Sequence, residues 1–183
     1  MLTLDAIQSR WEELPEHCKA FVRQQLYATN TFRPREDSPE EYDEQTAFVE
    51  SRDTVCLAVG GTGSGKTHCA ALKVAKFLLM DQPPPHKDTL FWVISDTYEQ
   101  CQQVCWFEKL FGTGEESQAL IPYEAVDWSK VVWANSKRNL PYSVTLKPWP
   151  KRPNKNWVLE FKSYDQGRHR MQASSIGGFW YGS

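Results

Sequence analysis

The chain has little that would place it in a membrane or outside the cell. None of its apolar runs approaches the length that spans a bilayer. Asp5, Arg10 and Glu12 interrupt the first stretch before an apolar signal segment can form. We therefore expect an intracellular protein without a membrane partner, and 183 residues are enough for one domain with a core of its own.

Cysteine is also sparse, and its spacing excludes the usual metal and disulfide patterns. The five cysteines include no C-x-x-C pair, and five is an odd number. This indicates reduced thiols rather than a disulfide framework. Cys101 and Cys105 lie one helical turn apart and could share a metal, but no histidine or second cysteine pair follows at zinc spacing, which favours buried core thiols.

The charge is small overall but unevenly distributed. The net charge is −2, yet residues 1–128 carry 11 basic against 21 acidic residues, and residues 129–183 carry 10 against 2. This asymmetry favours contact between one face and a polyanion. The alternative is an ordinary solvated basic surface beside an acidic one in the same fold.

The sequence GGTGSGKT at 60–67 is the most specific motif, since it matches G-x-x-x-x-G-K-[ST]. The apolar, β-branched run TVCLAV at 54–59 precedes it and predicts a strand leading into a phosphate-binding loop. The residues predicted to bind nucleotide there are Gly60, Gly61, Thr62, Gly63, Ser64, Gly65, Lys66 and Thr67. The alternative is a glycine-rich turn with a chance GKT.

Each residue type in the motif suits the chemistry of a bound ATP and Mg²⁺. Glycines let consecutive N–H groups approach phosphate oxygens closely. Lys66 would place its charge on the β and γ phosphates, a catalytic role, and Thr67 would place its hydroxyl on Mg²⁺. The helix that follows adds its positive N-terminal end.

The remaining periodicity predicts an α/β fold of the P-loop NTPase class. A helix is expected over 67–81, a buried strand over 89–94, and a helix over 101–111 with Ser95 as its cap. Two alternating runs at 143–148 and 156–163 predict a hairpin or strand pair, and an apolar run ends the chain. Right-handed crossovers would give a parallel sheet with helices on both faces. We expect an N-terminal helical segment and acidic connector over 1–40, and the ATPase domain over 41–183.

The basic second part predicts a contact with DNA. Two aromatic residues, Trp149 and Trp157, flank a loop between the paired strands, although core packing is the favoured use of Trp157. The candidate DNA-contacting residues are Lys147, Lys151, Arg152, Lys155, Arg168 and Arg170.

The order of these features resembles the large subunit of phage terminases over roughly residues 30–183. The resemblance is carried by Gln45 with Phe48, VCLAVGGTGSGKT, LFWVISDTYEQ with VCWFEKL, VLEFKSYDQG at 158–167 and the final IGGFWYGS. It implies that Gln45 reads adenine, although alone Gln45 would be taken as a surface residue. It also implies that the loop 97–100 lies near DNA or the nucleotide-coupling path.

The resemblance further implies an ATP-driven DNA-packaging motor of a bacteriophage. Its partners would be double-stranded DNA, the portal protein, the small terminase subunit and copies of itself in a ring. It would act in the host cytoplasm and, transiently, at the procapsid portal during virion assembly. The alternatives are a helicase-like DNA translocase and a nucleotide-binding module without turnover.

Two departures from the family pattern matter. Many members have an arginine where this chain has Thr62. The strand that should end in Asp and Glu ends here at Gly182 and Ser183, so either Ser183 takes the Asp position or both acids lie beyond it. We therefore expect an ATPase domain that is incomplete at its C-terminus, lacks a nuclease domain and hydrolyses ATP weakly.

Overall fold

The computed structural model describes residues 11–14, 16, 19, 39–61, 63–80, 89–111, 119–134, 141–147, 156–166 and 175–182. Its helical elements are η1 (Trp11–Glu13), α3 (Pro39–Glu50), α4 (Lys66–Met80), α5 (Tyr98–Gln100), η2 (Cys101–Leu110), η3 (Tyr123–Ala125), η4 (Trp128–Lys130) and η5 (Tyr164–Gln166). Its strands are β1 (Leu90–Ser95), β2 (Val132–Trp133), β3 (Pro141–Thr145), β4 (Val158–Ser163) and β5 (Gly178–Tyr181). None of the helices in these ranges is both long and apolar enough to cross a membrane.

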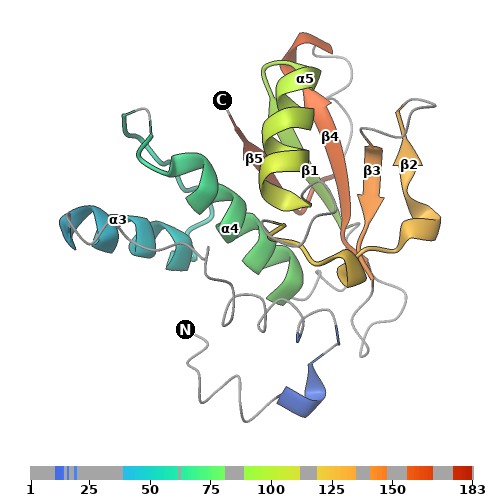
Figure 1. The fold of residues 1–183 in the computed structure, drawn as a ribbon, viewed down its shortest axis with the longest axis horizontal. Coiled ribbons are helices and arrows are strands. Elements are labelled where there is room, and N and C mark those ends of the chain that lie inside the picture. The colour runs from blue at the N-terminus through green and yellow to red at the C-terminus, as the bar shows by residue number, and fades with distance from the viewer. Residues whose placement is uncertain are drawn as a thin grey trace.

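The five strands form one mixed sheet in the order β2-β3-β4-β1-β5 (Figure 1). β4, β1 and β5 run parallel, whereas β3 pairs antiparallel with both β4 and β2. The predicted parallel sheet is therefore correct for three strands and wrong for the whole sheet, which β3 and β2 continue in antiparallel pairing. The predicted hairpin or strand pair of 143–148 and 156–163 is confirmed by β3 and β4. The chain between 141 and 163 folds back on itself as a strand pair, and such a connection gives antiparallel neighbours.

The helices α4 and η2 pack on the same face of the sheet. On α4, the ring of Phe77 lies 6.0 Å from that of Phe91 on β1. On η2, the ring of Trp106 lies 5.5 Å from that of Phe161 on β4. Phe91 pairs in register with Leu159, two residues before Phe161, so these side chains share one face. The expectation of helices on both faces is not met within the described residues.

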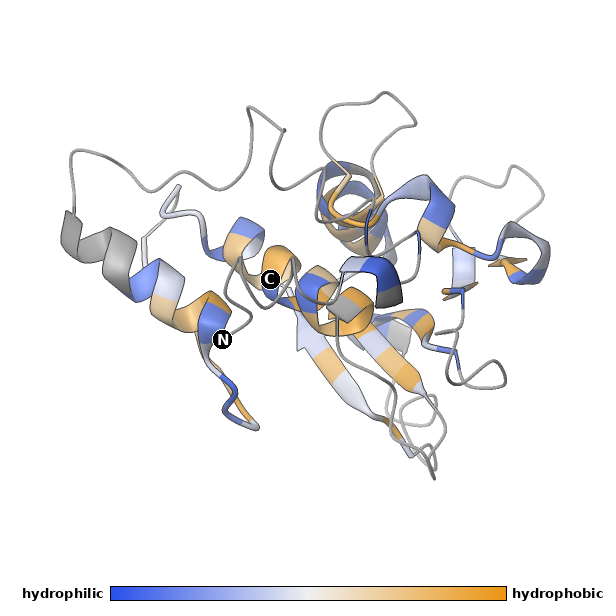
Figure 2. Ribbon diagram, turned by 90° about the horizontal axis from the view of Figure 1, so that it is seen from below, coloured by the Kyte–Doolittle hydropathy of each residue, from blue (hydrophilic) through white to orange (hydrophobic). Residues whose placement is uncertain are grey.

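The core lies between this face and the two helices. In Figure 2, α4 and the strands carry hydrophobic stretches between hydrophilic ones, as partly covered elements do. The fully covered aliphatic and aromatic side chains include Leu78, Leu79, Val93, Leu110, Ile121, Val126, Val144, Leu146, Leu159 and Phe161. These residues come from α4, β1, η2, β4, the end of β3 and the turns around 120–126. The core therefore extends from α4 across the sheet to the turns beside β3.

The opposite face of β1 and β4 carries a buried polar group. The Lys162 ammonium lies 3.0 Å from a carboxylate oxygen of Glu160 and 4.9 Å from the ring centre of Trp92. The Trp92 Nε1–H donates to the same carboxylate at 3.0 Å. Lys162 is only 5% exposed, and a buried lysine needs partners of this kind.

The predicted strand at 54–59 is absent, although these residues are described. They have no regular secondary structure, and Val55, Leu57 and Val59 are 76%, 83% and 85% exposed. A β-branched apolar run favours a strand, but a strand forms only where a neighbour accepts its hydrogen bonds. The described residues offer this segment no such neighbour. The β propensity of residues 54–59 therefore gave a wrong prediction.

The helix after β1 also differs from its prediction in two ways. Its N-cap is Thr97 rather than Ser95: the Thr97 hydroxyl accepts from the Gln100 N–H at 3.1 Å, whereas Ser95 still belongs to β1. Beyond Gln100 the helix widens into the π-helix η2, which ends with the Phe111 N–H donating to the Trp106 carbonyl at 3.0 Å. The thiols of Cys101 and Cys105 are buried beneath it, as expected.

The difference in exposure between Leu57 and Leu78 gives a test of this fold. Leu78→Ala should lower the free energy of unfolding by about 2–5 kcal/mol, because Leu78 is 2% exposed and its truncation leaves a cavity. Leu57→Ala should change that free energy by less than about 0.5 kcal/mol, because the side chain is already in water. Urea unfolding of both variants measures the difference. A Leu57→Ala loss as large as that of Leu78→Ala would mean that 54–59 is buried in the folded chain.

Candidate nucleotide-binding site

The glycine-rich loop adopts backbone conformations that favour glycine. Gly63 and Gly65 both have a φ of 80°, in the left-handed region that residues with side chains rarely adopt. The Ser64 N–H donates to the Gly61 carbonyl at 3.3 Å, which closes a tight turn. Helix α4 begins directly after this turn at Lys66, as the motif predicts. Thr62 lies outside the described residues.

The side chain of Lys66 folds over the loop. Its ammonium donates to the carbonyls of Gly60 at 2.8 Å and Gly61 at 2.6 Å, and lies 3.3 Å from the Ser64 hydroxyl. An ammonium has three donors, and here each has an acceptor within the loop. The oxygens of a bound phosphate would compete for the same three donors. Lys66 could therefore bind an anion by giving up its hydrogen bonds to the loop.

Gln45 of α3, for which the resemblance implies adenine recognition, contacts the loop through a hydrogen bond that was not predicted. Its Nε2 donates to the Ser64 carbonyl at 2.7 Å. A Cβ added at Gly65 would lie 3.4 Å from the same nitrogen, so Gln45 packs closely against the loop backbone. Among the hydrogen bonds of the described residues, none uses the amide oxygen of Gln45. Adenine recognition by Gln45 remains a prediction.

Two lysines of α4 hold α3 in the place where Gln45 can reach the loop. The Lys73 ammonium donates to the Phe48 carbonyl at 2.8 Å and to the carbonyl of Ser51, and lies 5.3 Å from the ring centre of Phe48. Lys76 forms an ion pair with Glu50. Cations near the last carbonyls of a helix satisfy acceptors that the helix leaves free. These contacts fix the end of α3 against α4.

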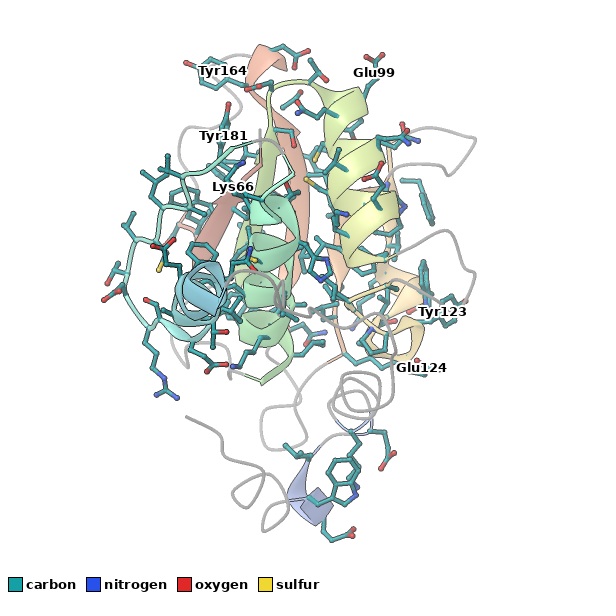
Figure 3. The ribbon with its side chains drawn as sticks, turned by 60° about the vertical axis from the view of Figure 1, so that its left-hand side comes forward. Lys66, Glu99, Tyr123, Glu124, Tyr164 and Tyr181 are labelled. Atoms are coloured by element: carbon teal, nitrogen blue, oxygen red, sulfur yellow. The ribbon has the colours of Figure 1, made fainter. Side chains whose placement is uncertain are left out.

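The loop lies at the carboxyl end of the parallel strands. Phe77 packs on Phe91 near the start of β1, and a Cβ added at Gly178, the first residue of β5, would lie 3.8 Å from the Phe77 ring. Lys66 precedes Phe77 by eleven residues, about 16 Å of helix. Asp96 follows Phe91 by five residues, about 17 Å of strand. Figure 3 likewise shows Lys66 and Tyr181 toward the same end of the molecule.

Three strand ends meet at Asp96, a residue that the sequence analysis overlooked. Its carboxylate accepts the Tyr181 hydroxyl of β5, and its carbonyl accepts the Asp165 N–H, which follows β4, at 3.4 Å. The Gly182 N–H donates to the Ile94 carbonyl at 2.9 Å, which extends the pairing of β5 with β1 by one residue. An acid directly after a buried strand was the available signal, since ligands of parallel sheets bind at the carboxyl ends.

Two ionisable groups near this end have shifted pKa values. Burial lowers the pKa of His68, in the first turn of α4, and the nearby charge of Lys109 lowers it further. The hydrogen bond to the Asp96 carboxylate raises the pKa of Tyr181, because the anionic phenolate could not donate it. Near neutral pH both groups therefore stay uncharged, and neither would repel or neutralise a bound phosphate.

No ready-made metal cluster exists in the part of the chain that the structure describes: no three His, Cys, Asp or Glu side chains gather there. The Cys101 and Cys105 pair does not face the loop; Cys101 Sγ lies 3.8 Å from the Val93 carbonyl and Cys105 Sγ lies 3.5 Å from the Ser95 hydroxyl. A metal in this site would depend on phosphate oxygens as well as on protein ligands, which is the usual mode for Mg²⁺.

One of the six candidate DNA-contacting residues is described. Lys147 is exposed, and its N–H donates to the Ala125 carbonyl at 2.8 Å, so it is fixed beside η3 at the base of the predicted basic loop. The other five, Lys151, Arg152, Lys155, Arg168 and Arg170, lie outside the described residues. Their grouping on one surface remains a prediction.

Comparisons with known proteins return little. The sequence matches no family model and no curated protein. A solved structure similar to this chain is the ATPase domain of the large terminase of Thermus phage P74-26, with 18% sequence identity and a TM-score of 0.46. The match covers 82% of this chain and 58% of the chain of the terminase ATPase domain.

Proposed function

We propose that this chain binds ATP with Mg²⁺ through residues 60–67. The observation that carries the proposal is the conformation of the loop: two glycines at a φ of 80° lead directly into helix α4, with Lys66 at its first residue. Such a loop presents N–H groups to an anion, and the helix N-terminus adds a partial positive charge. No acidic residue in the first turn of α4 opposes that charge.

The residues present fit the triphosphate and its metal. The Lys66 ammonium already binds three oxygen acceptors of the loop. Phosphate oxygens can take the place of these acceptors, since the three donors stay the same. Thr67, the second residue of α4, would offer its hydroxyl to Mg²⁺. When bound, Mg²⁺ neutralises charge on the β and γ phosphates. Gln45 would hold the loop through Ser64 and could present its amide oxygen to the adenine amino group.

On the larger scale we propose the motor domain of a terminase-type DNA-packaging ATPase. The order of motifs from Gln45 to the final strand supports this reading, and the excess of basic residues over 129–183 supports a contact with duplex DNA. The portal protein, a small terminase subunit and a ring of like subunits would be its partners. A helicase-like translocase shares the same order of elements and remains the related alternative.

A nucleotide-binding module without turnover is the second candidate. The observation that favours it is that the contacts of the loop among the described residues come from Gln45, Ser64 and Lys66 and include no carboxylate that could orient an attacking water. Positioning and charge stabilisation dominate phosphoryl transfer, so a site without such a group binds nucleotide and hydrolyses it slowly. Turnover therefore separates the two candidates, whereas binding does not.

Replacing Lys66 by Ala tests nucleotide binding. The variant loses the ammonium placed against the β and γ phosphates, so its ATP affinity should fall by at least tenfold, about 1.4 kcal/mol. Isothermal titration calorimetry with ATP and Mg²⁺ measures this change. Lys130→Ala, a lysine on η4 whose partner is Asp127, is the control and should bind as the parent does. Equal affinity of the parent and the Lys66→Ala protein would rule out the proposed site.

Turnover by the 183-residue chain should be slow. We expect a rate of ATP hydrolysis close to that of the Lys66→Ala protein, because no carboxylate that could orient a water contacts the loop among the described residues. Release of inorganic phosphate measures it for both proteins at saturating ATP. Rapid hydrolysis that disappears in Lys66→Ala would contradict this expectation and identify the chain as a competent ATPase.

Changing Lys151 and Arg152 to Ala tests the DNA contact. Phosphate contacts release counterions, so removal of up to two of them should reduce the log–log slope of duplex affinity against salt by about two and weaken all sequences alike. Fluorescence anisotropy over a salt series gives the slope. Arg52→Ala, an exposed cation in the acidic half, is the control. An unchanged slope in the double variant would show that the basic loop is a solvated surface.

A further inference from the structure

The peptide between Ser64 and Gly65 is the part of the loop whose orientation the local sequence leaves open. Ser64 stands between Gly63 and Gly65, and both glycines have a φ of 80°. Because glycine accepts φ values of either sign, a peptide plane beside it can turn at little cost. A trans peptide directs its carbonyl and its N–H to opposite sides. The group that binds the Ser64 carbonyl therefore also decides where the Gly65 N–H points.

Gln45 is the residue that binds this carbonyl. Its Nε2 lies 2.7 Å from the Ser64 oxygen, and only the NH₂ end of an amide can face a carbonyl oxygen. A Cβ added at Gly65 would lie 3.4 Å from the same nitrogen, so the peptide has little room to turn on this side. Among the hydrogen bonds of the described residues, none uses the Gly65 N–H. This N–H points away from α3 and is available to a phosphate oxygen.

Lys73 fixes the part of α3 that carries Gln45. α3 lies beside α4 (Figure 1), and the Lys73 ammonium donates to the carbonyls of Phe48, at 2.8 Å, and of Ser51. Phe48 follows Gln45 by three residues, about one turn of α3. Lys73 follows Lys66 by seven residues, about two turns of α4. The helix that begins at the loop is thus joined, through one lysine, to the helix that holds the loop.

We infer that Gln45, anchored by Lys73, acts as a clasp on the phosphate loop: Gln45 is a positioning residue that turns the Gly65 N–H toward the phosphates, whatever base the nucleotide carries. The inference rests on the proposed binding of nucleotide at residues 60–67 and deepens it. A donor that is already oriented needs less ordering when the anion binds, which raises the affinity. Because the clasp acts on the backbone of the loop, it affects a bare polyphosphate as much as ATP.

Recognition of adenine by the Gln45 amide would give a different pattern. A contact with the base favours ATP over GTP and leaves tripolyphosphate, which has no base, unaffected. The clasp changes the affinities for all three ligands by the same factor. Tripolyphosphate is therefore the ligand that separates a contact made through the loop from a contact made with the base.

The experiment is a calorimetric titration of the 183-residue chain with tripolyphosphate, ATP and GTP, each in Mg²⁺. Gln45→Met keeps the length of the side chain and loses the donor to Ser64, so it should lower all three affinities about fivefold, as expected for one hydrogen bond. Lys130→Met is the control and should change none of them by more than twofold, because Lys130 pairs with Asp127 on η4. Thermal unfolding of each variant shows whether the fold is retained.

A double-mutant cycle tests the anchor. Lys73→Met alone should lower the three affinities about threefold, because Gln45 then loses its fixed place. If Lys73 acts through Gln45, the variant with both changes should bind no more than twofold more weakly than Gln45→Met alone. Damage to two independent parts of the structure would instead multiply the losses to about fifteenfold. That larger loss would overturn the role of Lys73.

The outcomes separate this inference from the proposed function. If the parent binds all three ligands and Gln45→Met binds tripolyphosphate as the parent does, the clasp is wrong and nucleotide binding stands. A parent that binds ATP but not tripolyphosphate would also overturn the clasp, because binding would then depend on the base. If the parent binds none of the three, the proposed function fails and this inference fails with it. Gln45→Met decides the clasp even if Lys73→Met does not fold.

Discussion

The packing of Phe77 across the starts of β1 and β5 is the contact on which the arrangement of the site depends. The ring of Phe77 meets Phe91 and Trp157. Gly178 leaves room for the Phe91 ring, because a Cβ at this position would lie 2.8 Å from it. With this end of α4 fixed, its length carries Lys66 to the opposite end of the strands. The position of the loop is thus set by an apolar contact about 16 Å away along α4.

A second constraint links the loop to the segment before it. Gln45 reaches the Ser64 carbonyl only because Lys73 and Lys76 fasten the end of α3 to α4. The half-buried Lys73 ammonium, which binds two carbonyls, contributes more to this contact than the ion pair of Lys76, because its donors are shielded from water. The loop therefore has a rigid helix on each side, and its own bonds to Lys66 close it until an anion competes for them.

A third set of contacts joins the carboxyl ends of the parallel strands. Asp96 joins β1 to β5 through Tyr181 and to the turn after β4 through Asp165. Directly after it, Thr97 caps α5, which continues into the π-helix η2. A change in charge at Asp96 would act on a strand end and on a helix start together. π-helical segments occur often at functional sites, and here one begins five residues from the acid.

The sequence by itself determined the loop, the helix that follows it and the buried strand β1, because each depends on local chemistry: glycine at positive φ, an unbroken run of helix formers, and an apolar run bounded by polar residues. Only the tertiary structure decided that Val55, Leu57 and Val59 lie in solvent, that β2 pairs antiparallel with β3, and that Asp96 meets Tyr181. Strand pairing and strand-end contacts join residues far apart in the chain, 85 positions in the case of Asp96 and Tyr181, and no local pattern encodes which distant partner is present.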